Sequence, residues 1–262
     1  MDLFYVVPGR SKDILGDNFL RPLQVIINCG DHSVSVAAAS TEEYFSDFQD
    51  LLKEDLGDYR GPSHRIQLGP DVQPSAVRLR PIPMAQLDAV KKEIISLDQQ
   101  GVWEPVDYSE WAHPMVVVPK KEGGLRITSD LTRLNRYVIP ERFPLPRIKD
   151  LISNLGGAQF FSKIDLRKSY HQIQLHPDSR PLTTTITPLG LRQYKRLPMG
   201  LKDSASAFQR RVSMALQGLP GVQAYIDNII VFGWAREEHD QNLRGALRRL
   251  HDTGFRIQEK KL

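Results

Sequence analysis

The chain has 262 residues, of which 40% are hydrophobic and 25% are charged, a composition typical of globular proteins with one or two domains. The single cysteine, Cys29, excludes an intrachain disulfide framework and a zinc site made of several cysteines. We find no apolar run long enough for a signal peptide or a membrane span. We therefore expect an intracellular protein, in the cytoplasm or the nucleus, with no membrane partner.

The net charge of +4 is unevenly distributed along the chain. Residues 1–75 contain 6 Lys and Arg against 12 Asp and Glu, whereas residues 76–262 contain 29 against 19. An acidic segment is therefore joined to a basic one, and a basic module attracts polyanions such as nucleic acid. A solvated surface of mixed charge would explain the same numbers without any such partner.

The first 83 residues show weak patterns. Short apolar runs between Gly, Pro and Asn turns predict four strands, at Leu3–Val7, Ile14–Leu20, Leu23–Asn28 and Ser33–Val36. Residues 1–36 are too few for a domain of their own. Residues 37–83 are rich in acids and proline, which predicts a linker with one amphipathic helix at about Glu42–Leu52.

The basic part begins with a clear helix. Apolar residues recur with helical spacing from Met84 until Gly101 ends the pattern; they are Leu87, Val90, Ile94 and Leu97. A hairpin follows, because Met115–Pro119 and Leu125–Thr128 flank a tip of two lysines, a glutamate and two glycines.

The tip of that hairpin carries cations that suit phosphate groups. Glycines allow the backbone to approach a ligand, and Lys120, Lys121 and Arg126 could bind a triphosphate or a phosphate backbone. A surface hairpin with ordinary charges would have the same pattern.

The middle of the chain alternates strands and helices. A helix is predicted at about Ile148–Leu155, and an apolar strand starting at Phe160 ends in Asp165. A second hairpin joins Leu182–Thr187 to Leu191–Leu197, and a helix then runs over Ser204–Gln217, with Gly218 beyond its end. This order predicts an α+β fold, an antiparallel sheet backed by helices.

The segment Val222–Phe232 predicts a third hairpin, with apolar residues buried on both strands and Asp227 and Asn228 at an exposed turn. Asp-Asn is also good turn chemistry, so an ordinary structural hairpin is the alternative. An amphipathic helix, Arg236–Thr253, and a final strand, Phe255–Gln258, complete the pattern.

Four blocks of the chain resemble a known family in order and spacing. They are LRITSDLTRLN (125–135), PLPRIKDLISNLGGAQFFSKIDLRKSYHQI (144–173), YKRLPMGLKDSASAFQR (194–210) and AYIDNIIVFG (224–233). They resemble the fingers and palm of the reverse transcriptase of gypsy-class LTR retrotransposons, over about residues 76–262. Residues 12–23 resemble the C-terminal end of a retroviral-type aspartic protease, without its Asp-Thr-Gly or Asp-Ser-Gly triplet.

This resemblance implies a division of the chain. Residues 1–36 would be a retropepsin-like C-terminal remnant, residues 37–83 a linker, and residues 84–262 the fingers and the polymerase palm, without the thumb and the ribonuclease H region. The implied activity is RNA-directed DNA polymerisation, with an RNA template, a DNA primer and deoxynucleoside triphosphates as partners. The chain would belong to a larger polyprotein or an oligomer.

The resemblance also implies roles for single residues. Asp165 and Asp227, with the carbonyl of Leu166, would bind two Mg²⁺ ions, or Mn²⁺ in their place, so we expect the two carboxyl groups within about 6 Å of each other. Tyr170 would exclude the 2′-hydroxyl of ribonucleotides. The residues implied to bind or border the nucleotide are Lys120, Lys121, Arg126, Leu166, Tyr170, Met199, Gly200 and Gln209.

One departure from the family pattern affects the catalytic residues. The family has Tyr-x-Asp-Asp at the hairpin tip, where this chain has Tyr225-Ile-Asp-Asn228. An amide keeps the shape of a carboxylate but lacks its charge, so we expect the fold and the metal site to persist with strongly reduced turnover. Two functions stay open: a working or weakened polymerase, and a non-catalytic nucleic-acid-binding remnant of a retroelement.

Overall fold

The computed structural model describes residues 4–5, 15–16, 25–28, 33–36, 46–120 and 123–258. The chain forms two compact units. The first comprises Met1–Glu54, Leu145–Arg167 and Val212–Leu262, and the second comprises Asp55–Pro144 and Lys168–Arg211. Within the described residues, no helix combines the length and the apolar character needed to cross a membrane.

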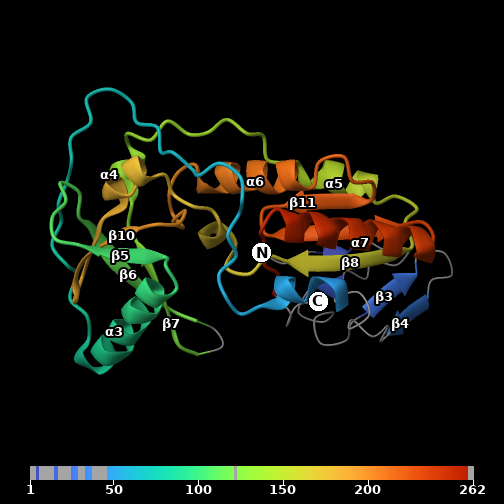
Figure 1. Cartoon of the computed structure of the whole chain (residues 1–262), viewed down its shortest axis with the longest axis horizontal. Helices are drawn as coiled ribbons and strands as arrows, with labels where there is room; N and C mark the ends of the chain where they lie inside the picture. Colours follow the sequence, from blue (N-terminus) through green and yellow to red (C-terminus); the bar gives the residue numbers. More distant parts are fainter. Residues whose placement is uncertain are drawn as a thin grey trace. The chain divides into compact units, whose positions relative to one another are not determined.

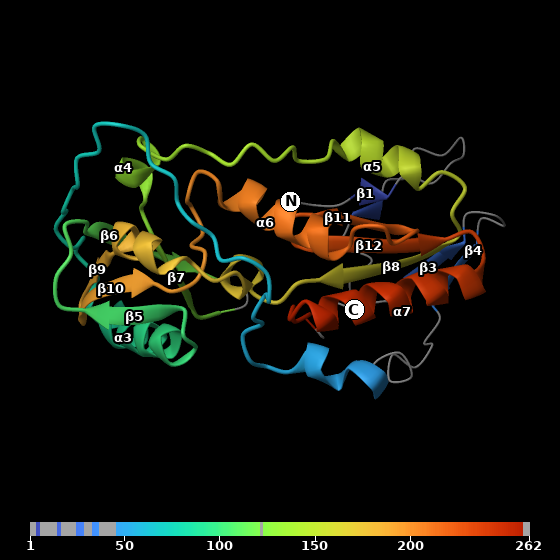
Figure 2. The ribbon, with the colours of Figure 1, turned by 45° about the horizontal axis from the view of Figure 1, so that its top comes forward.

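The first unit is built around an antiparallel sheet of three strands in the order β11-β12-β8, with helix α7 packed on it (Figures 1 and 2). Strand β8 is Phe160–Asp165, β11 is Val222–Tyr225, β12 is Asn228–Gly233, and α7 is Arg236–Asp252. Strand β12 lies in the centre and pairs with both of the others. The predicted strand ending at Asp165 and the predicted antiparallel sheet are confirmed.

Alternation along these strands gives the sheet two different faces. Ile164, Ile229 and Val231 are completely buried and share the face that α7 covers. Asp165 and Asn228 lie opposite each other on the other face. Only part of the hairpin is therefore buried, because β11 is half-buried along its whole length. The expectation of burial on both strands was wrong for β11.

The charges at the two ends of helix α7 favour a helix. Glu237 and Glu238 lie in its first turn and Arg249 and His251 in its last, which complements the helix dipole. Its apolar side is buried, and the imidazole of His239 lies 2.9 Å from the Ser162 hydroxyl on β8. The helix predicted over Arg236–Thr253 is confirmed.

Two further segments complete the first unit. The helix α5 (Ile148–Asn154) is found where it was expected, and the 3-10 helix η1 (Ser46–Leu52) packs against α7. Residues 42–45 of the expected helix lie outside the described residues. The predicted strand Phe255–Gln258 is reduced to one isolated antiparallel bridge, between Ile257 and Leu166, so that prediction was wrong in extent.

The second unit contains a sheet of five strands in the order β5-β10-β9-β6-β7, with α3 (Met84–Gln99) packed on β5 and β7 (Figure 1). The strands are β5 (Trp103–Val106), β6 (His113–Pro119), β7 (Leu125–Ser129), β9 (Thr185–Thr187) and β10 (Gly190–Tyr194). Both predicted hairpins and the helix from Met84 are confirmed. The sheet is nevertheless mixed, because β6 and β9 run parallel.

Short helices lie between these strands. The helix α4 is Thr132–Asn135, η2 is Ser169–Gln172, η3 is Pro177–Ser179 and η4 is Pro181–Thr183. Strand β9 is shorter than expected, because Pro181 begins a 3-10 turn where the sequence predicted strand. The helix α6 (Ser204–Ala215) begins where it was expected, and Gly218 follows it with a φ of +81°.

Four strands are described in the first 36 residues. β1 (Phe4–Tyr5) pairs with β2 (Leu15–Gly16), and β3 (Val25–Asn28) pairs with β4 (Ser33–Val36), both antiparallel. All four lie inside the predicted strands. Cys29 and the other residues of 1–36 lie outside the described residues.

The β11–β12 hairpin turns one residue earlier than expected. Tyr225 pairs with Asn228, so Ile226 and Asp227 form a two-residue loop and Asn228 is already the first residue of β12. Ile226 has a φ of +54°, which a β-branched residue rarely adopts, whereas Asp227 does not have a positive φ. The favoured two-residue loops of β-hairpins have a positive φ at their first residue, which fits the twist of the paired strands.

A pair of substitutions on β12 tests the two faces of this sheet. Ile229→Ala removes a completely buried side chain and leaves a cavity, which should lower the free energy of unfolding by about 2–5 kcal/mol. The neighbouring Ile230 is half-buried on the opposite face, so Ile230→Ala should cost less than half as much. Urea unfolding of both variants measures the difference, and equal losses would contradict the assignment of the faces.

Candidate active site

The first unit places the catalytic candidates next to each other at the ends of paired strands. Asn228 lies directly opposite Asp165, and the Leu166 amide donates a 3.0 Å hydrogen bond to the Asp227 carbonyl. Paired residues in antiparallel strands have Cα atoms about 4.5–5.5 Å apart. The sheet register therefore brings together residues that are 61 and 63 positions apart in the sequence. The expected approach of the two carboxyl groups to within about 6 Å stays a prediction.

The polar groups at this point include two close contacts. The Asn228 side chain donates from Nδ2 to Asp227 Oδ1 at 3.2 Å. The ammonium nitrogen of Lys163 lies 3.4 Å from Asp165 Oδ1, with side-chain exposures of 18% and 10%. Two carboxylates and one ammonium thus lie at the end of the sheet. Lys163 was not identified from the sequence, although its position two residues before Asp165 on a strand places both on one face.

The loop of this hairpin carries backbone strain. A left-handed conformation costs an L-residue about 1–2 kcal/mol, and Ile226 adopts it immediately before Asp227. Such strain persists only where the surroundings hold it in place, and it often occurs at functional sites. Here the pairing of Tyr225 with Asn228 closes the loop on both sides.

The donor atoms at this site fit a metal that shares its coordination with a substrate. Within the residues that the structure describes, no three His, Cys, Asp or Glu side chains gather closely enough to hold a metal ion alone. Mg²⁺ is usually bound by one or two carboxylates together with substrate phosphates and water. Asp165 and Asp227 match that requirement. Two carboxylates are too few to coordinate an ion by protein side chains alone.

The second unit holds the candidates for nucleotide binding. Arg126 lies on β7, exposed and paired in register with Val118. Lys120 follows β6, is exposed, and lies 3.8 Å from the carboxylate of Glu93 on α3. The Lys120 amide also bonds the Gly124 carbonyl, which closes the hairpin tip. Lys121 lies outside the described residues.

Tyr170 and its neighbours form a compact group in the second unit. Tyr170 lies on η2, half-buried, with its ring 5.1 Å from the ring of Phe208 on α6. The pKa of the adjacent His171 is lowered to about 4, first by burial and then by the charges of Lys168, Arg196 and Arg126. His171 is therefore neutral at pH 7, and the positive charge near Tyr170 comes from lysine and arginine side chains.

The segment before α6 is held by one asparagine. The Asn135 side chain donates to the Gly200 carbonyl and accepts from the Lys202 amide, both at 2.8 Å. Gly200 has a φ of +85° and is exposed, and Met199 is half-buried. Gln209 is 1% exposed, so it lies inside the unit rather than on its surface.

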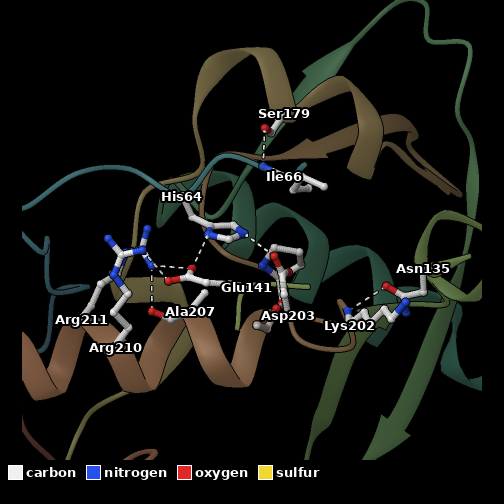
Figure 3. A network of polar contacts seen from close by, with 12 residues as sticks. His64, Ile66, Asn135, Glu141, Ser179, Lys202, Asp203, Ala207, Arg210 and Arg211 are labelled. Atoms are coloured by element: carbon white, nitrogen blue, oxygen red, sulfur yellow. Dashed lines mark hydrogen bonds and ion pairs between the residues drawn. The ribbon is translucent and has the colours of Figure 1, made fainter. Parts of the chain in front are cut away.

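A network of polar contacts joins α6 and the residue before it to distant segments (Figure 3). His64 Nε2 lies 3.2 Å from Asp203 Oδ2, and both side chains are buried. The carboxylate of Glu141 lies 2.6 Å from Arg210 and 3.7 Å from Arg211. Burial lowers the pKa of Arg211, an effect that the charge of Glu141 opposes.

None of the residues that hold α6 in this network was identified from the sequence. They are His64, Asn135, Glu141 and Asp203, and each comes from a different segment of the second unit. A lone histidine in a proline-rich stretch gives no local signal of burial. A pairing that joins residues more than 60 positions apart is visible only in the folded chain.

Comparison with known proteins identifies the family. The family model described as reverse transcriptase (RNA-dependent DNA polymerase) matches residues 118–262. The Pol polyprotein of the Drosophila melanogaster transposon gypsy is 32% identical over 73% of this chain and 19% of its own length. That of transposon opus, from the same organism, is 29% identical over 98% of this chain and 29% of its own length. The chain thus spans less than a third of these relatives.

Solved structures show the same fold. The foamy viral protease-reverse transcriptase, solved in complex with double-stranded DNA, superposes with a TM-score of 0.77 at 24% identity, covering 84% of this chain and 39% of that one. The family match covers more than half of the chain, and it includes β8, β12 and the residues around Asp165 and Asp227. The chain therefore belongs to the reverse transcriptase family and is a fingers-and-palm reverse transcriptase domain of the kind found in LTR-retrotransposon Pol polyproteins.

Proposed function

We propose that this chain carries out template-directed nucleotidyl transfer, with Asp165 and Asp227 as the metal-binding carboxylates. The observation that carries the proposal is the register of β12 against β8, which places Asn228 opposite Asp165 and bonds the Asp227 carbonyl to Leu166. Two Mg²⁺ ions bound there would activate the primer 3′-hydroxyl and neutralise the charge on the phosphates. The carbonyl of Leu166 is a further candidate ligand.

The second unit would bind the incoming nucleotide. Arg126 and Lys120 are exposed cations that could hold the triphosphate, and Lys121 is a third candidate from the sequence. Tyr170 is held by ring packing on Phe208, so it could act as a fixed steric barrier to a 2′-hydroxyl. Met199 and Gly200, in the segment that Asn135 holds, would border the nucleotide. The buried Gln209 would support that segment from α6.

The partners follow from the same proposal. Foamy viral relatives were solved with double-stranded DNA and with an RNA/DNA hybrid. We propose an RNA template, a DNA primer and deoxynucleoside triphosphates for this chain, inside a larger polyprotein and in the cytoplasm or nucleus. Residues 1–36 would be a protease-like remnant and residues 37–83 a linker.

A non-catalytic, nucleic-acid-binding role is the second candidate. It is favoured by Asn228, which removes one negative charge beside Asp227 and offers an amide donor to that carboxylate. A divalent ion is held less strongly where the local negative charge is smaller. The two candidates differ in whether nucleotides are added to a primer.

Replacing Asn228 separates the two candidates. Asn228→Asp should raise the rate of primer extension about tenfold or more and lower the Mg²⁺ concentration required. Extension of a DNA primer on RNA, titrated with Mg²⁺, measures both quantities. Asp227→Ala is the inactive control. No extension by either form, with hybrid binding intact, would leave only the binding role.

Tyr170 can be tested by its selectivity. Tyr170→Val should increase incorporation of ribonucleotides relative to deoxynucleotides at least about tenfold, because it removes a steric clash with the 2′-hydroxyl. Tyr170→Phe keeps the ring and should keep the discrimination. Single-nucleotide incorporation with matched ribo- and deoxyribonucleotides measures the ratio. Unchanged discrimination in an active Tyr170→Val enzyme would show that the ring serves only packing.

Binding of an RNA–DNA hybrid tests the basic module without requiring catalysis. Affinity should fall steeply as salt rises from about 50 to 200 mM, because phosphate contacts release counterions. Arg126→Gln should reduce the slope of log affinity against log salt by about one unit, whereas the exposed Lys149→Gln on α5 should matter less. Fluorescence anisotropy measures these slopes. A flat salt response would contradict nucleic-acid binding by the charged surface.

A further inference from the structure

Lys163 forms an ion pair with the candidate metal ligand Asp165. Both residues lie on β8, two positions apart, so their side chains leave the same face of the sheet. The Lys163 ammonium lies 3.4 Å from Asp165 Oδ1, and the two side chains are only 18% and 10% exposed. This restricted contact with water weakens the screening of the ion pair.

The charge balance at the end of the sheet differs from that of a site with three carboxylates. Asp165 and Asp227 contribute two negative charges, Asn228 contributes none, and Lys163 contributes one positive charge. The net charge of this group is therefore −1. Each divalent ion brings a charge of +2, so it is attracted by the two carboxylates and repelled by the ammonium.

We infer that Lys163 competes with divalent metal for Asp165 and thereby sets the metal affinity of this chain. The inference rests on the proposed metal site at Asp165 and Asp227. A lysine suits this role because its ammonium is a compact charge on a flexible stem, which can leave the carboxylate when a metal ion arrives. Without metal, the ammonium supplies part of the charge compensation that the buried Asp165 carboxylate requires.

Competition between Lys163 and the metal ion predicts opposite changes in the stability of the metal-free protein and in its metal affinity when Lys163 is replaced. Removing the Lys163 charge should take away one favourable interaction of Asp165, so the metal-free protein loses stability. The same change should strengthen metal binding, because the ion no longer displaces an ammonium. A purely structural pair would show the loss of stability without the gain in metal affinity.

Metal binding can be measured without any catalytic assay. Mn²⁺ is titrated into the full chain, and the free ion is followed by its electron paramagnetic resonance signal. Asp165→Asn defines the binding that does not belong to this site. Lys163→Met should bind Mn²⁺ about tenfold more tightly than the natural chain, and Lys163→Arg, which keeps the charge, should not.

A matched control removes the same charge elsewhere. Lys149 lies on α5 in the same unit and is exposed, so Lys149→Met should keep the Mn²⁺ affinity within about twofold of that of the natural chain. Thermal unfolding should show that Mn²⁺ raises the melting temperature of Lys163→Met more than that of the natural chain. This second measurement also reports on any loss of folding in the variant.

The outcomes distinguish this inference from the proposed function. Equal Mn²⁺ affinity in Lys163→Met and the natural chain, with binding still lost in Asp165→Asn, overturns the role of Lys163 and leaves the metal site intact. Binding that is unaffected by Asp165→Asn overturns the metal site itself, and the role of Lys163 with it. Tighter binding in Lys163→Met alone, lost on further replacement of Asp165, supports both.

Discussion

The antiparallel register of β8 against β12 is the constraint on which the catalytic arrangement depends. Pairing of Asn228 with Asp165 fixes every other pair along the two strands, and a shift by one residue would move each side chain to the opposite face. Burial of Ile164, Ile229 and Val231 beneath α7 opposes such a shift, because it would place polar groups in the core. The apolar face of the sheet thus determines where the carboxylates lie.

The end of this sheet carries less negative charge than its carboxylates alone would supply. Asn228 replaces a charged group with an amide, and Lys163 places an ammonium beside Asp165. Both features weaken the attraction for divalent ions by the same electrostatic mechanism. They involve different atoms on neighbouring strands, β12 and β8, so their effects can be separated by substitution.

In the second unit, buried polar groups hold the segment that leads into α6. Asn135 bonds two backbone groups of that segment, while His64, Asp203, Glu141 and the α6 arginines connect it to distant parts of the chain. Removing one partner of a buried polar contact leaves the other without compensation, which destabilises the fold. This network therefore resists displacement of α6, on which Phe208 supports Tyr170.

The sequence by itself determined the helices from Met84 and Arg236, three hairpins, the strand ending in Asp165 and the family, because each depends on local periodicity or on contiguous motifs. Tertiary structure alone decided the partial burial of β11, the early turn at Ile226, the parallel pairing of β6 with β9, and the Lys163 and His64 contacts. These features depend on residues far apart in the chain, which only the folded backbone brings within reach of one another.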